Sequence, residues 1–120
     1  MQVDFAFRLP EFPIIGDIDG WLILAKSAAE FARRLDRVEL KPEGRYYLVD
    51  SIGNEWVFST DGQYVMPTLK RKWSKKKIVQ MYNDSKNSEQ AGVKYSERSL
   101  SIKHFATIFA DIVELVERSQ

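Results

Sequence analysis

The sequence predicts an α+β domain, in which an antiparallel sheet packs against a long C-terminal helix and two short helices. Three observations indicate this class. Tyr, Val, Phe and Trp are concentrated in residues 45–66, where Gly-Asn and Asp-Gly sequences divide the segment into three parts. Apolar residues recur at spacings of three and four after Ser101. Short turns, rather than helical crossovers, join the predicted strands, which disfavours a doubly wound fold.

The N-terminal part of the chain is predicted to contain one strand, one loop and one helix. Large apolar residues alternate with other residues over 2–9, which is typical of a strand with one buried face, and Pro10 ends it. Two glycines and a proline predict an ordered surface loop over residues 11–20. Residues 21–24 are apolar but too few to assign. A Ser followed three residues later by a Glu forms a capping-box pattern, which predicts a helix over Ser27–Leu35.

The middle of the chain predicts a three-stranded antiparallel meander, which the N-terminal strand is expected to join in one sheet. The predicted strands are Arg45–Ser51, Glu55–Thr60 and Gln63–Met66. Their aromatic and β-branched residues favour a pleated, partly buried surface. The side chains expected to contribute most to the sheet are Tyr47, Val49, Trp56 and Phe58.

The C-terminal half predicts two helices separated by a flexible loop. Ser74 is a plausible N-cap for a short helix whose apolar side includes Ile78 and Tyr82. Residues 83–92 are polar and lack periodicity, which predicts the loop. A long amphipathic helix is expected from about Ser101 to the C-terminus. Its predicted buried stripe consists of Ile102, Phe105, Phe109, Ile112 and Val116.

Composition limits the class of protein. A chain of 120 residues with 44% hydrophobic residues is expected to form one globular domain over residues 1–120. It contains no cysteine, which excludes disulfides, thiolate zinc sites and thiol nucleophiles. It shows neither a secretory signal pattern nor an apolar segment of about 20 residues, so we expect a cytoplasmic protein without a membrane span.

Candidate catalytic and metal-binding groups are few. The single histidine, His104, is expected on a helix surface, and one histidine excludes a histidine-rich metal site. Residues 17–20, Asp-Ile-Asp-Gly, open like a calcium loop, but the apolar residues that follow favour a turn held by side-chain hydrogen bonds. The candidate carboxylates for acid-base chemistry are Asp50, Glu55 and Asp61, which lie near the predicted turns. No motif for a cofactor is present.

The most unusual feature is a basic segment, residues 70–77, with six positive charges within eight residues. Of 18 Lys and Arg residues, these six leave 12 against 17 Asp and Glu, a charge of −5, so an uneven charge distribution is expected. Lysines in the first turn of a helix oppose its macrodipole but favour an anion there. The alternatives are a binding surface for an acidic protein, a nucleic-acid site in which Trp73 stacks on a base, and a solvated helix entrance with Trp73 turned into the core.

Residues 46–57, Tyr-Tyr-Leu-Val-Asp-Ser-Ile-Gly-Asn-Glu-Trp-Val, resemble hairpins of small bacterial proteins of unknown role, including immunity proteins that neutralise a cognate toxin. The resemblance implies a class, small cytosolic non-enzymatic binders, and transfers no residue role.

The sequence therefore favours a non-catalytic protein-binding module with an acidic protein as partner, and the resemblance adds the expectation of an immunity protein that neutralises a cognate toxin. A nucleic-acid-associated protein that uses the basic segment and a small enzyme with a carboxylate site are the alternatives. No signal bears on oligomeric state. The residues expected to bind the partner are Lys70, Arg71, Lys72, Trp73, Lys75, Lys76, Lys77, Asp50 and Asp61.

Overall fold

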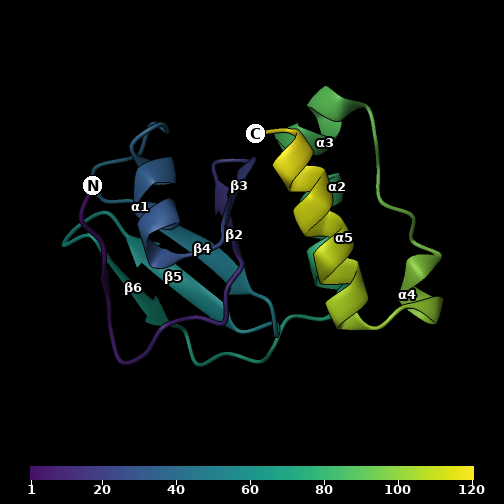
Figure 1. The fold of residues 1–120 in the computed structure, drawn as a ribbon, viewed down its shortest axis with the longest axis horizontal. Coiled ribbons are helices and arrows are strands. Elements are labelled where there is room, and N and C mark those ends of the chain that lie inside the picture. The colour runs from purple at the N-terminus through teal and green to yellow at the C-terminus, as the bar shows by residue number, and fades with distance from the viewer.

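The computed structural model describes residues 1–120 and confirms the α+β fold (Figure 1). Six strands form one sheet in the order β1-β6-β5-β4-β2-β3, and only the β1–β6 pair is parallel. The strands are β1 (Asp4–Phe5), β2 (Ile14–Ile18), β3 (Trp21–Ala25), β4 (Arg45–Asp50), β5 (Glu55–Ser59) and β6 (Tyr64–Pro67). The helices are α1 (Ala28–Leu35), α2 (Lys75–Asn83), α3 (Lys86–Ala91), α4 (Ser99–Ile102) and α5 (Phe105–Arg118).

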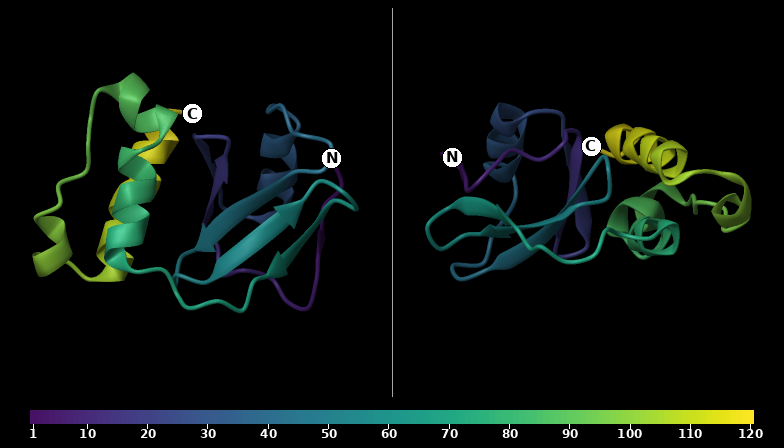
Figure 2. Two further views of the ribbon diagram at one scale, coloured as in Figure 1. Left: turned by 180° about the vertical axis from the view of Figure 1, so that it is seen from behind. Right: turned by 90° about the horizontal axis from the view of Figure 1, so that it is seen from below.

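The sheet curves so that α1 lies on its inner face and α2 and α5 lie on its outer face, beside β2 and β3 (Figure 2, right). The inner face and α1 bury one apolar core, which consists of Ile14, Ile18, Ile23, Ala25, Phe31, Leu35, Tyr46, Leu48, Trp56, Phe58 and Val65. A second core joins the outer face to the C-terminal helices and consists of Ile15, Leu22, Leu24, Val49, Ile78, Val79, Tyr82, Tyr95, Ile108, Phe109, Ile112 and Val116.

The meander forms as predicted, with strands β4, β5 and β6 antiparallel. Leu48 pairs with Trp56 and Tyr46 with Phe58, so these large side chains share the inner face. Trp56 and Phe58 are fully buried there, and Val49 is fully buried on the outer face. Tyr47 differs, because 43% of its surface is exposed on the part of the outer face that no helix covers. It belongs to the sheet, as predicted, but lies outside the buried core.

The N-terminal strand is much shorter than the alternating pattern predicts. Only Asp4 and Phe5 pair with β6. Phe7 then takes a φ of 73°, and the amide of Arg8 bonds to the carbonyl of Ala6. This turn rotates Phe7 and Leu9 into solvent, with 86% and 58% of their surfaces exposed. Residues 7–9 therefore do not continue the strand.

The predicted surface loop over residues 11–20 is wrong, because Ile14–Ile18 forms β2, between β3 and β4. The misleading residue is Gly16. A Cβ atom built there would lie 2.7 Å from Cδ2 of Leu48, so this glycine permits close approach of a neighbouring side chain rather than a turn. The β2–β3 connection does match the expected turn, since the amide of Gly20 donates to Oδ1 of Asp17 at 2.8 Å.

Two predictions in the C-terminal half also need correction. Residues 83–92 are not a loop, because Ser85 caps the short helix α3. The last helix does not begin at Ser101. Lys103 and His104 have extended backbone between α4 and α5, and Ile102 is 76% exposed. From Phe105 on the predicted stripe is correct, with Phe109, Ile112 and Val116 buried and Phe105 half-buried.

The sheet has a capped edge at β3 and a very short edge strand at β1. On β3, the side-chain amide of Asn87 accepts from the amide of Leu22 at 2.7 Å and donates to its carbonyl at 3.1 Å, as a neighbouring strand would. Oε1 of Gln120 accepts from the amide of Leu24. On the opposite side β1 pairs with β6, which ends at Pro67, a residue without an amide hydrogen. The helices of this fold are all too short or too polar to cross a bilayer.

Candidate functional site

The basic segment begins in the chain between β6 and α2 and is tied to the β4–β5 hairpin on both sides. The amide of Thr68 donates to the carbonyl of Glu55 at 3.2 Å, and the amide of Trp73 donates to the carbonyl of Gly53 at 2.9 Å. Between these bonds the chain bulges outward. Leu69 takes a φ of 60°, and 89% of its surface is exposed. Residues 69–72 therefore form an exposed bulge, and hydrogen bonds to the β4–β5 hairpin fix the chain on either side of it.

Three of the six cations in this segment contact other groups. Nζ of Lys77 lies 3.4 Å from Oε2 of Glu55 and 4.4 Å from the ring centroid of Trp73. Nζ of Lys75 donates to the carbonyl of Lys103, the residue after α4, at 3.1 Å. Nζ of Lys70 lies over the ring of Tyr47, 5.7 Å from its centroid. These three lysines help to hold α2 and the preceding chain in place.

The other three cations are free. The side chains of Arg71, Lys72 and Lys76 are exposed, and no hydrogen bond or ion pair involves their charged groups. Arg71 and Lys72 lie on the bulge and Lys76 in the first turn of α2. The structure thus separates the predicted site into three structural and three unpaired charges.

Trp73 is turned inward rather than outward. It is half-buried against the outer core, and its indole Nε1 donates to Oε2 of Glu55 at 3.0 Å. Its ring is also covered by Lys77. This is the arrangement expected for a core anchor, and it leaves Trp73 poorly placed to stack on a base.

Glu55 is the centre of this arrangement. Burial by itself raises the pKa of Glu55, but hydrogen bonds from Trp73 and Thr68 and the charge of Lys77 together outweigh it, so the pKa lies below its usual value. Glu55 is only 6% exposed, and its Oε1 is buried without a hydrogen-bond partner. Its carboxylate is therefore held ionised by structural contacts.

The N-terminus of α2 carries a side-chain cap. Oγ of Ser74 accepts from the amide of Lys77 at 3.1 Å, as the sequence predicts. The first turn contains no acidic residue, but the carboxylate of Glu55 from β5 is bonded to Lys77 in that turn. An anion near this helix end is favourable, so Glu55 offsets the cost of the three lysines.

Asp50 and Asp61 occupy different environments, and neither lies with the basic segment as a shared site. Asp50 is completely buried, and its two oxygens accept from the amides of Glu11, Ile52 and Asn54 and from Nε1 of Trp56. It is a structural group that shapes the β4–β5 turn. Asp61 is exposed in the β5–β6 turn, at the opposite end of the meander from residues 70–77.

Sequence reasoning missed a polar cluster that attaches residues 93–103 to α5. The hydroxyl of Tyr95 donates to Oδ2 of Asp111 at 2.6 Å, and Nζ of Lys103 lies 2.9 Å from the same oxygen. The hydrogen bond from Tyr95, followed by that from Lys103, lowers the pKa of Asp111. No local pattern could have shown it, since three separate segments contribute. His104, beside it, is exposed and caps no backbone amide.

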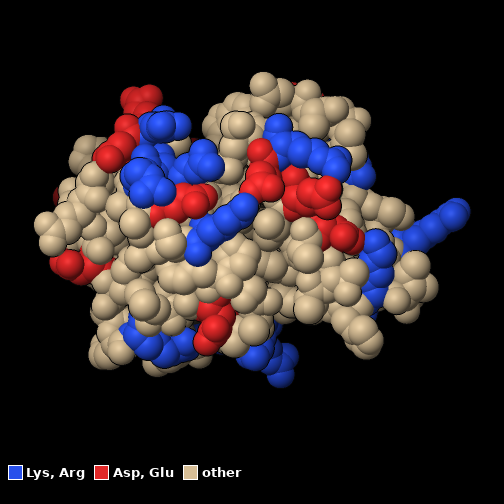
Figure 3. Space-filling model, in the orientation of Figure 1, with Lys and Arg blue, Asp and Glu red and all other residues tan.

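Positive charge also gathers away from the basic segment, next to acidic side chains. Figure 3 shows Lys and Arg side chains gathered over α1 and, separately, over the right side of the molecule, with Asp and Glu between them. A hollow next to α1 is lined by Lys26, Arg33, Arg34 and Arg37 together with Glu30 and Glu117. These cations have acidic neighbours, unlike Arg71, Lys72 and Lys76.

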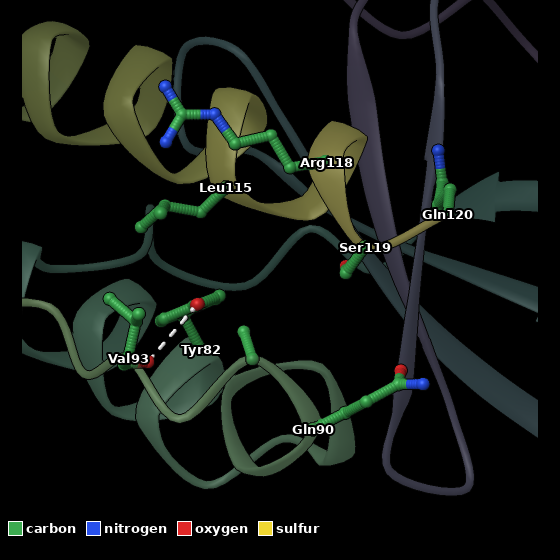
Figure 4. A pocket seen from close by; sticks show the side chains of 8 residues that line it. Tyr82, Gln90, Val93, Leu115, Arg118, Ser119 and Gln120 are labelled. Atoms are coloured by element: carbon green, nitrogen blue, oxygen red, sulfur yellow. Dashed lines mark hydrogen bonds between the residues drawn. The ribbon is translucent and has the colours of Figure 1, made fainter.

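One cavity lies between α2, α3 and the end of α5 (Figure 4). It has a volume of about 320 Å³ and an apolar wall that includes Tyr82, Val93 and Leu115. Two of its polar side chains are engaged, since the hydroxyl of Tyr82 donates to the carbonyl of Val93 and Arg118 pairs with Glu114. Burial raises the pKa of Tyr82. The cavity presents no free charged group to a ligand.

Comparison with known proteins found no similar protein. No protein-family model, no curated protein and no solved structure matches it. The site is therefore interpreted from its own geometry.

Proposed function

We propose that this protein is a non-catalytic, cytoplasmic protein-binding module of immunity type, which docks an acidic protein through the basic segment. The observation that carries the proposal is the set of three unpaired, exposed cations, Arg71, Lys72 and Lys76, on a chain anchored to the β4–β5 hairpin. Charges held on a fixed frame lose little conformational freedom on binding, and unpaired ones need not break an existing ion pair.

The inward position of Trp73 favours a protein over a nucleic acid. Sequence-independent binding of single strands relies on exposed aromatic rings as stacking platforms. Trp73 instead donates its indole N–H to Glu55 and carries Lys77 on its ring. The positive charges alone remain for a nucleic acid, and they number three once the structural lysines are set apart.

The geometry of the carboxylates disfavours an enzyme. Asp50 accepts from four donors, and Glu55 accepts from Trp73 and Lys77. A general acid or base must reach a substrate proton, and neither carboxylate is exposed enough to do so in this conformation.

The test uses a triple variant, Arg71→Gln, Lys72→Gln and Lys76→Gln. A matched control, Arg33→Gln, Arg37→Gln and Arg98→Gln, removes the same charge from exposed residues elsewhere. The partner is first isolated by affinity capture on wild-type protein in nuclease-treated native lysate, then purified and titrated against all three proteins. The 71/72/76 variant should bind more weakly, mainly through slower association, whereas the control should bind like wild type.

Equal association rates and equal salt dependence for the 71/72/76 variant and wild type would contradict the proposal. Loss of the captured partner upon nuclease treatment would instead support the nucleic-acid alternative, because counterion release makes such binding steeply salt-dependent.

A further inference from the structure

The part of the outer sheet face that no helix covers is a second candidate binding surface, besides the basic segment. Helices α2 and α5 pack against β2, β3 and Val49, but they do not extend over the outer side of the rest of β4, β5 and β6. A hollow of about 390 Å³ lies there. It is lined by Arg45, Tyr47, Val57, Met66, Pro67, Thr68 and Lys70.

The floor of this hollow is apolar and its rim is positive. Val57, at 2% exposure, forms the base between Tyr47 and Met66, and Tyr47 itself is 43% exposed. Arg45 and Lys70 supply the only charges of the lining, which contains no carboxylate. The charged group of Arg45 has no hydrogen bond or ion pair. An apolar floor with two cations at its rim complements an apolar side chain flanked by carboxylates.

The hollow is continuous with the basic segment, because Lys70 belongs to both. Its Nζ lies over the ring of Tyr47, and the next two residues are the unpaired Arg71 and Lys72. Strand addition is disfavoured, since Asn87 and Gln120 occupy the β3 edge and the opposite edge strand, β1, has only two residues. A partner is therefore expected to bind the face of the sheet rather than its edge.

We propose that the acidic protein partner inserts an apolar or aromatic side chain into this hollow while its neighbouring carboxylates meet Arg45, Lys70 and the unpaired cations. This inference rests on the proposed function and deepens it by naming the anchor. Tyr47 and Met66 supply the contact area, and the cations set the orientation. Aromatic side chains surrounded by a polar rim commonly carry most of an interface's affinity.

The experiment follows backbone amide shifts of isotope-labelled protein during titration with two peptides. One is acetyl-Glu-Asp-Leu-Phe-Asp-Glu-amide, and the other replaces Leu and Phe by Ser. The apolar peptide should bind about fivefold more tightly, as expected for partial burial of its side chains. It should shift amides at residues 45–47, 57 and 66–70. Both peptides should shift residues 71, 72 and 76.

Three variants separate the contributions. Tyr47→Thr introduces a β-branched residue, which a strand accommodates well, and should abolish the difference between the two peptides. Lys70→Glu changes only an exposed residue of the connecting chain and should weaken both peptides alike. The matched control is Tyr64→Thr, the same change on the same sheet but outside the hollow, and it should bind like wild type.

The outcomes distinguish this inference from the proposed function. Equal affinity for both peptides, with shifts confined to residues 71, 72 and 76, would overturn the hollow as anchor and leave the basic segment as the binding surface. No shifts with either peptide at millimolar concentration would overturn both. Tighter, steeply salt-dependent binding of a short oligothymidylate than of either peptide would also overturn both, in favour of nucleic acid.

Discussion

The inner and outer faces of the sheet are built from the same kinds of residue, yet they are covered to different extents. On the inner face Leu48, Trp56 and Phe58 are fully buried beneath α1 and the N-terminal chain. On the outer face coverage stops at Val49, and Tyr47, two residues earlier on the same strand, is 43% exposed. The inner face is thus devoted to stability, whereas the outer face combines a core with an accessible surface.

The position of the basic segment follows the same division. It crosses the outer face where the covered part ends, and Glu55, Trp73 and Lys77 form the boundary. On the covered side Lys75 and Lys77 make structural contacts, whereas on the bare side Lys70 contacts only the exposed ring of Tyr47. A residue's contribution to stability or binding should therefore depend on which side of this boundary it lies.

The largest expected difference is between aromatic residues of the two faces. Phe58→Ala should reduce the free energy of unfolding by about 3–5 kcal/mol, the usual cost of removing a buried Phe. Tyr47→Thr should cost about 1 kcal/mol or less, because it alters a half-exposed cross-strand pair. Urea denaturation monitored by tryptophan fluorescence measures both. Similar losses for the two variants would show that the outer face is not bare in solution.

Asp50 and Asp61 offer a second contrast, between a buried and an exposed turn carboxylate. Asp50→Ala should cost about 3 kcal/mol, because it leaves the buried indole N–H of Trp56 and a turn amide without their acceptor. Asp61→Ala should change stability by about 0.5 kcal/mol or less, as is usual at an exposed site. The same denaturation assay applies. A small loss for Asp50→Ala would mean that water replaces the carboxylate.

The boundary between the covered and bare parts should be sensitive to acid through Glu55. Its pKa is below the usual value of 4.5 in the folded protein, so its ionised form stabilises the fold above that pH. This contribution should disappear as the pH falls through the folded-state pKa. The stability advantage of wild type over Glu55→Gln should therefore be constant near pH 6 and shrink towards about pH 3. An advantage that does not change between these pH values would contradict the assignment.

The smallest effect is expected for the unpaired cations. Replacing Arg71, Lys72 and Lys76 with Gln should change the free energy of unfolding by no more than about 0.5 kcal/mol. A slight increase is expected, because like charges no longer repel each other. Lys77→Gln should destabilise the protein more than this triple change, because it removes the ion pair with Glu55 and the contact with Trp73. The reverse order would mean that the structural and free charges were assigned wrongly.

The elements that the sequence predicts correctly are those with local causes. Ser27 and Ser74 cap their helices with their own side chains, and the Gly-Asn and Asp-Gly turns separate the strands of the meander. The stripe of α5 is correct from Phe105 on. Each signal is contained within a few residues, so no information about the rest of the fold is needed to interpret it.

The errors have distant causes. Gly16 suggests a turn, but it is required by Leu48 across the sheet. Residues 83–92 suggest a loop because they are polar. Two of these polar side chains, however, are buried, since Asn87 bonds to Leu22 and Ser88 bonds to Val93. At the candidate site the sequence locates the cations but not their partners. Only the fold shows that Glu55 binds Lys77 and that Asp50 is enclosed.

The hydrogen bonds between Asn87 and Leu22 also affect the tendency of the protein to aggregate at high concentration. Strand β3 has the sequence Trp-Leu-Ile-Leu-Ala. On its outer edge the amide and carbonyl of Leu22 bond to Asn87 of α3, and the amide of Leu24 bonds to Gln120, rather than to another strand. When α3 detaches, this strand presents a flat apolar edge, which is a template for pairing between molecules. The side-chain amides of Asn87 and Gln120 therefore protect the folded protein from aggregation through β3.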